Sequence, residues 1–215
     1  MSRTLLLILA TTVTIGGLVV VVWGASQVLR LAPSRARLLA GILLLIYGAV
    51  LIFRPSAWLV IDTAVLIGAV GATVLIGGSL SSSGAVVAMV VAAAAVDILS
   101  VSGGLTRAII DGYREGTSDL LLYLGLVVPI GGRLTPIVGI SDLLIGGSAA
   151  VALIRLGLRP VAVIGAIAIG LLGALVYGIW RGGVAALPFI AIAVLLLVWR
   201  NSAKSSRPVG GDSAL

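Results

Sequence analysis

The feature that most constrains this chain is a series of uncharged or nearly uncharged apolar runs, each long enough to match the thickness of a bilayer. A helix needs about 20 apolar residues to cross the hydrocarbon core, and somewhat fewer where neighbouring helices shield its ends. Because 60% of the residues are apolar and only 10% are charged, the chain cannot keep its apolar surface out of water as a soluble domain. We therefore expect an all-α fold, a polytopic transmembrane helical bundle of about seven spans. The expected spans are residues 4–23, 38–53, 58–76, 84–101, 136–154, 160–179 and 184–199.

A shorter apolar run, residues 120–129, follows the one substantial loop and ends at Pro129. It is too short for a helix to cross the bilayer, so a strand or a re-entrant segment is favoured, and an eighth, short span is the alternative. We expect three regions along the chain. They are an N-terminal region of three spans (1–83), a second region that holds the remaining spans (84–200) and a disordered polar tail (201–215).

The composition excludes several kinds of catalytic site. The chain has no histidine and no cysteine, which rules out H-E-x-x-H zinc sites, serine–histidine dyads and thiolate sites. The single lysine, Lys204, lies in the polar tail and supports no serine–lysine dyad. We expect no metal and no cofactor, so any acid–base chemistry inside the membrane must use carboxylates.

The basic residues indicate an orientation. The net charge of +7 comes mostly from arginines at the ends of apolar runs, which is typical of topology signals and anionic headgroups rather than of a nucleic-acid surface. With seven spans, three basic segments lie on one side, which the positive-inside rule makes cytoplasmic. We expect a multi-pass protein of the cell membrane with a cytoplasmic carboxyl terminus. These segments carry Arg30, Arg35, Arg37, Arg155, Arg159, Arg200, Lys204 and Arg207.

Three of the seven acidic residues, Asp62, Asp97 and Asp142, lie within expected spans. An aspartate in the bilayer costs about 2.5–3.5 kcal/mol on insertion scales, so a functional role is the default interpretation. The alternative is a neutral acid that bonds a neighbouring helix, which we favour for Asp62 because it lies near the interface. Small residues three and four positions from Asp97 and Asp142 allow close helix approach, which makes a meeting of these two side chains feasible.

Four short segments follow one another in a recognisable order. They are residues 96–103 around Asp97, Leu-Val-Val-Pro at 126–129, Gly-Ile-Ser-Asp at 139–142 and Ala-Ala-Leu-Pro-Phe at 185–189. In this order they resemble the aspartate motif, the apolar segment ending in proline, the G-x-G-D motif and the P-A-L motif of the presenilin and signal peptide peptidase family. Val96, Ser141 and Ala185 depart from these motifs, and the family normally has nine spans.

The resemblance implies a presenilin-like arrangement of the C-terminal half and an intramembrane aspartyl protease with Asp97 and Asp142 as its catalytic dyad. One carboxylate acts as general base on a water and the other, protonated, acts as acid toward the scissile carbonyl. The expected partners are the lipid bilayer and a transmembrane peptide or signal peptide, which must unwind and pair with a strand. The residues implied to shape the site are Gly139, Ser141, Ala186, Leu187 and Pro188, and the strand candidates are Leu124, Leu126, Val127 and Val128.

Other classes of protein stay open. A transporter subunit or a structural or stress-related membrane protein fits the Gly- and Ala-rich spans, and proton-coupled transport also uses buried aspartates. An inactive presenilin homologue shares the same motifs. A prepilin-peptidase-like enzyme also has a G-x-G-D aspartate, but Asp97 lies within an apolar run rather than in a cytoplasmic loop, and no cysteine-rich segment is present.

Overall fold

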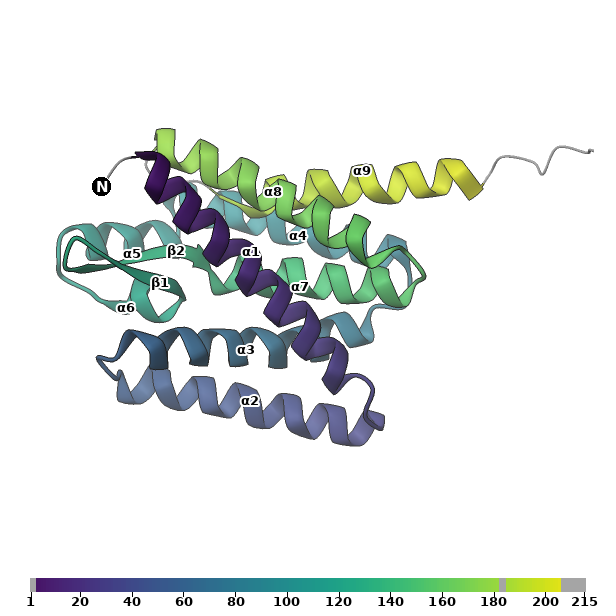
Figure 1. Ribbon diagram of the computed structural model, residues 1–215, viewed down its shortest axis with the longest axis horizontal. Coiled ribbons are helices and arrows are strands. Elements are labelled where there is room, and N and C mark those ends of the chain that lie inside the picture. The colour runs from purple at the N-terminus through teal and green to yellow at the C-terminus, as the bar shows by residue number, and fades with distance from the viewer. Residues whose placement is uncertain (1–2, 182–184, 206–215) are drawn as a thin grey trace, which may run out of the picture.

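The computed structural model describes residues 3–181 and 185–205 and is 80% helical (Figure 1). Long helices make up most of this part of the chain, and two short helices and a β-hairpin lie between α4 and α7. The long helices are α1 (Arg3–Val28), α2 (Pro33–Phe53), α3 (Trp58–Ser79), α4 (Ser83–Gly103), α7 (Ile140–Arg155), α8 (Pro160–Arg181) and α9 (Leu187–Ser205). The short elements are α5 (Leu105–Arg114), α6 (Leu120–Tyr123), β1 (Gly125–Ile130) and β2 (Arg133–Gly139).

Five helices within the described residues are long and apolar enough to cross a membrane, which fits the expected helical membrane protein. They are Thr4–Val28, Pro33–Phe53, Trp58–Ser79, Ser83–Gly103 and Pro160–Gly178. α7, with 16 residues, and the apolar part of α9, Leu187–Ala203, are shorter. Each of the seven expected spans has a helix as its counterpart, and the number of spans beyond these five stays a prediction.

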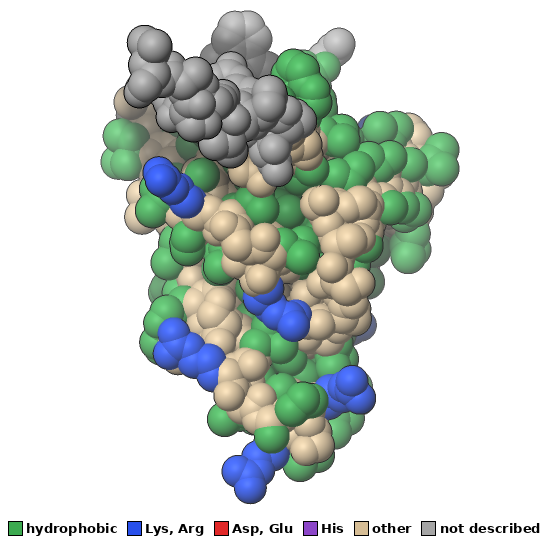
Figure 2. Space-filling model, turned by 90° about the vertical axis from the view of Figure 1, so that its right-hand side faces the viewer, with side chains coloured by type: hydrophobic (Ala, Val, Ile, Leu, Met, Phe, Trp, Pro, Cys, Tyr) green, Lys and Arg blue, Asp and Glu red, His purple; other side chains and the backbone are tan. Residues whose placement is uncertain are grey.

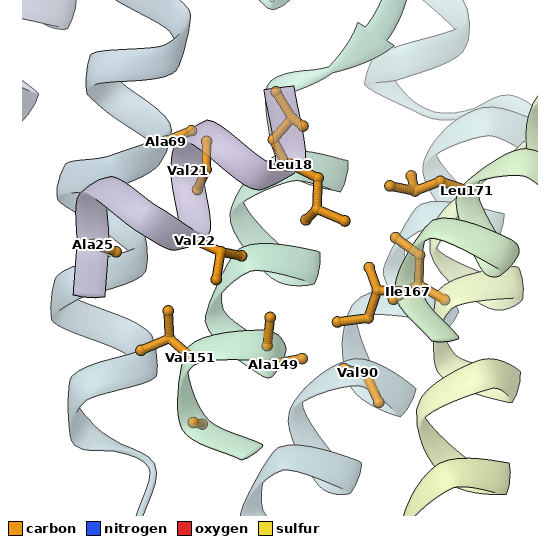
Figure 3. Packing of buried hydrophobic residues seen from close by; sticks show 14 of the residues in the cluster. Leu18, Val21, Val22, Ala25, Ala69, Val90, Ala149, Val151, Ile167 and Leu171 are labelled. Carbon is orange, nitrogen blue, oxygen red and sulfur yellow. The ribbon is translucent and has the colours of Figure 1, made fainter. Parts of the chain in front are cut away.

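α7 lies inside the bundle, where it packs against α1, α3, α4 and α8. Figure 3 shows side chains of α1, α4 and α8, among them Leu18, Val90 and Ile167, gathered around Ala149 of α7. The close crossing of α7 and α1 depends on small residues, because a Cβ added at Gly147 of α7 would lie 2.8 Å from Val21 Cγ1 of α1. A helix enclosed in this way needs less length than one that faces lipid, because its ends are shielded by protein.

β1 and β2 form an antiparallel hairpin that leads directly into α7. Gly131 and Gly132 make the turn, with φ of 59° and 81°, a backbone conformation that residues other than glycine rarely adopt. Cα pairing runs from Ile130↔Arg133 to Gly125↔Gly139, with a bulge between Leu126 and Val127. The hairpin makes the all-α prediction incomplete.

Three expected boundaries are corrected. The strand expected within 120–129 begins at Gly125, because residues 120–123 form α6. The span expected from residue 136 begins as a helix only at Ile140, because the extended backbone of β2 continues to Gly139, which precedes the first turn. The polar tail expected from 201 is helical up to Ser205, while residues 206–215 and the expected span start at 184 lie outside the described residues.

Candidate active site

A cavity of about 550 Å³ lies where α4, α7 and α8 meet α5 and the hairpin, and both Asp97 and Asp142 line it. The two carboxyls are near enough to interact electrostatically. Two aspartates from different helices therefore share one cavity, as a dyad requires. Most other lining residues are aliphatic, among them Val101, Ile109, Ile110, Leu121, Leu124, Ile137, Leu171 and Leu175.

Asp142 projects from the first turn of α7, where backbone N–H groups have no partner within the helix. Its Oδ2 atom accepts the N–H of Gly139 at 3.3 Å, an interaction typical of a helix start. A Cβ added at Gly139 would lie 3.2 Å from the same oxygen, so a larger residue would crowd the carboxyl. Ser141 also lines the cavity. The structure thus places the G-x-G-D-like segment at the cavity wall.

Asp97 faces the start of α9, although its neighbours Val96 and Ile98 are exposed on the outside of the bundle. Its Oδ2 atom accepts the N–H of Leu187 at 3.0 Å, and the N–H of Ala186 also interacts with the carboxyl. Because α9 is packed against α4, this contact joins the aspartate helix to the segment that resembles P-A-L. The structure thus brings the backbone N–H groups of Ala186 and Leu187 to the carboxyl of Asp97.

Pro188 is the second residue of α9 and is not among the residues that line the cavity. A proline suits the first turn of a helix, where an N–H would have no partner within the helix. The carbonyl of Ala186 accepts the N–H of Phe189 at 3.1 Å, which begins the helix around the proline. Pro188 therefore contributes to the site indirectly, by helping to start α9.

The strand candidates of β1 need a correction. Leu126 and Val127 are buried, and β1 pairs with β2 along one edge. At the other edge Val127 donates its N–H to Asp62 Oδ1 of α3 at 2.8 Å. The N–H of Val127 is therefore not available to a substrate strand, and Val128 is paired with Thr135 of β2. Leu124 lies before the strand, at the end of α6.

Thr14 and Tyr113 are among the residues lining the same cavity that sequence reasoning missed. Thr14 of α1 is 2% exposed, and its hydroxyl has no hydrogen-bond partner within the described part of the chain. Tyr113 of α5 donates its hydroxyl to the carbonyl of Leu134 in β2. The amphipathic pattern of residues 105–114 was the available signal for α5, because its ion pair Arg107–Asp111 lies on the face opposite the apolar residues.

No protein-family model matches this chain, and neither the curated proteins nor the solved structures give a significant match. Within the described residues, no group of three or more Asp and Glu side chains is arranged to hold a metal ion. The fold and the cavity define a helical membrane protein in which two carboxyls line one cavity.

Proposed function

We propose that this protein is an intramembrane aspartyl protease of the presenilin and signal peptide peptidase type. The observation that carries the proposal is that Asp97 and Asp142 line one cavity within the helical bundle. The contact between the carboxyl of Asp97 and the N–H of Leu187 adds support, because it joins two of the four motif-like segments beside the cavity that Asp142 of a third segment also lines. The aliphatic lining fits a transmembrane segment or signal peptide as the substrate.

The chemistry needs one ionised and one protonated carboxyl. The ionised carboxyl takes a proton from a water, whose oxygen bonds to the scissile carbonyl carbon, and the protonated carboxyl gives its proton to the carbonyl oxygen. When the carbon–nitrogen bond breaks, the leaving nitrogen takes the proton that the first carboxyl gained from the water, and one hydroxyl of the diol gives its proton to the other carboxyl as the carbonyl re-forms. The N–H groups of Gly139 and Leu187 hold one oxygen of each carboxyl and so fix the orientation of the pair.

A transmembrane helix must unwind before its peptide bonds can be reached, and an unwound segment needs new partners for its backbone. β2 supplies them in place of β1, because residues 135–139 line the cavity directly before Asp142. Addition of an extended segment to a free strand edge is a common mode of peptide binding. A segment paired with β2 would pass beside the dyad.

Cleavage of a membrane-anchored reporter in liposomes tests the proposal. Asp97→Asn and Asp142→Asn should each lower the cleavage rate at least about 100-fold, because each removes one partner of the acid–base pair. The matched control is Asp62→Asn, which also replaces an aspartate of a membrane-spanning helix but lies outside the cavity lining. Asp62→Asn should keep the cleavage rate within about threefold of the wild-type rate.

Unchanged cleavage in both dyad variants would refute the dyad, and the absence of cleavage by the wild type would refute the protease. Proton-driven uptake of a solute by the wild type, lost in Asp97→Asn and Asp142→Asn, would instead indicate a transporter.

A further inference from the structure

The register of the hairpin shows which backbone groups of β2 point away from β1. In an antiparallel pair, opposite residues alternate between hydrogen-bonded pairs and pairs whose backbone groups point outward. The N–H of Val127 and the carbonyl of Leu134 both leave the hairpin, toward Asp62 and Tyr113 respectively. Val127 is paired with Pro136, so Leu134 and Pro136 form the outward-pointing edge of β2.

This outer edge of β2 is short. At the end nearer the turn, the carbonyl of Leu134 accepts the hydroxyl of Tyr113. At the other end, the N–H of Gly139 is bonded to Asp142. Pro136, between them, has no N–H and offers only its carbonyl to an incoming strand. A strand that pairs with β2 therefore finds its partners between Leu134 and Gly139.

α5, which carries Tyr113, is bonded to α4 at its start and to the turn that follows it at its end. At the start of the helix, Ser100 of α4 accepts the N–H of Thr106 at 3.1 Å and shares a hydroxyl–hydroxyl bond of 2.6 Å with it. Just past the end, the carbonyl of Gly112 accepts both the N–H and the hydroxyl of Thr117, at 2.9 and 3.1 Å. α5 thus reaches from the helix of the first aspartate to the hairpin, and carries the tyrosine hydroxyl to the strand edge.

We propose that Tyr113 is a positioning residue that sets the register of the substrate strand on β2, an inference that rests on the proposed function. By occupying the carbonyl of Leu134, the hydroxyl closes the end of the edge farther from Asp142. Pairing is thereby confined to the part of β2 beside the dyad. Without the hydroxyl, a strand can also pair farther out, displaced by two residues, because a shift of one residue would turn its side chains to the opposite face.

Disulfide cross-linking measures this register without any need for catalysis. The chain has no cysteine, so Thr135→Cys, at a cavity-lining position of β2, introduces a single thiol. The probe is a Leu/Ala transmembrane peptide of about 20 apolar residues with one cysteine moved along it. The assay uses the Asp142→Asn background, so that the peptide stays intact. With Tyr113 present we expect one preferred cross-linking position, and in Tyr113→Phe a second position displaced by two residues.

Tyr123→Phe is the matched control, because it also removes a hydroxyl bonded to a carbonyl, that of Pro55 at 3.2 Å, away from the edge of β2. It should leave the cross-linking position unchanged, and the melting temperatures of both variants distinguish a change of register from a loss of structure. The same cross-linking positions with and without the Tyr113 hydroxyl would overturn the proposal, as would the absence of any cross-link to residue 135. The absence of cleavage by the wild type would refute the protease alone.

Discussion

At the scale of single residues, two intramembrane aspartates do the same structural task in different places. Asp97 accepts the N–H of Leu187, and Asp62 accepts the N–H of Val127, so each joins segments that are far apart in the sequence. The hydrocarbon core has no water to replace such a bond, and a backbone N–H without an acceptor is costly there. A carboxylate in a span is therefore not by itself evidence of catalysis, and only Asp97 and Asp142 also face the cavity.

Replacing Asp62 tests this structural role. Asp62→Leu leaves the N–H of Val127, a residue that is 0% exposed, without its acceptor, and should lower the free energy of unfolding by about 1–3 kcal/mol. Asp62→Asn keeps an oxygen at the same position and should lose clearly less. Denaturant unfolding in detergent micelles measures both. Equal stability of Asp62→Leu and the wild type would mean that the bond to β1 contributes nothing.

At the scale of elements, the position of α9 depends on a close crossing with α8. A Cβ added at Gly170 would lie 2.8 Å from the carbonyl oxygen of Phe189 and 3.0 Å from Ile190 Cα, so backbone must move to accommodate it. We expect Gly170→Ala to lower the free energy of unfolding by about 1–3 kcal/mol. It should also slow cleavage, because the displaced start of α9 carries the N–H that Asp97 accepts.

Gly165 provides the matched control in the same helix, since a Cβ there meets no atom within 4 Å. Gly165→Ala should be neutral or stabilising by up to about 1 kcal/mol, because alanine favours a helix more than glycine does. Thermal unfolding and reporter cleavage are measured for both variants. If the two alanines have the same effect, the crossing of α8 and α9 is not as tight as its geometry indicates.

The elements also show what the sequence could predict. Long apolar runs predicted the long helices, because hydrophobic length is a local property that the bilayer imposes. A strand within 120–129 was favoured, but its partner β2 and the helix α5 were missed for a common reason: the pairing of Val128 with Thr135, and the contact of Tyr113 with Leu134, exist only once the chain has folded. The aspartates were identifiable from their cost in lipid, whereas Thr14 was not, because a threonine in an apolar run is unremarkable in sequence.

At the scale of the whole molecule, the two ends of the bundle differ in charge. Figure 2 looks at the end where α1 meets α2 and α7 meets α8, and basic side chains are spread over the described part of this face. The connections at this end contain no acidic residue. The other end has arginines too, Arg54, Arg107, Arg114 and Arg133, but there Asp111 of α5 and its C-cap Glu115 offset part of their charge. From the positive-inside rule we predict that the end shown in Figure 2 is cytoplasmic and that the hairpin and α5 lie on the opposite side. The basic residues at the predicted cytoplasmic end include Arg30, Arg35, Arg37, Arg155 and Arg159.

Labelling of single cysteines tests this orientation, since the chain has no thiol of its own. Ser34 and Glu115 are both exposed, and three helices long enough to cross the membrane, α2, α3 and α4, lie between them. Because three crossings separate them, Ser34→Cys and Glu115→Cys must lie on opposite sides whether or not α7 and α9 span the bilayer. A membrane-impermeant maleimide should label Glu115→Cys in intact cells and Ser34→Cys only after permeabilisation. The reverse result would invert the orientation and place the cavity-forming hairpin on the cytoplasmic side, and labelling of both from one side would contradict three crossings.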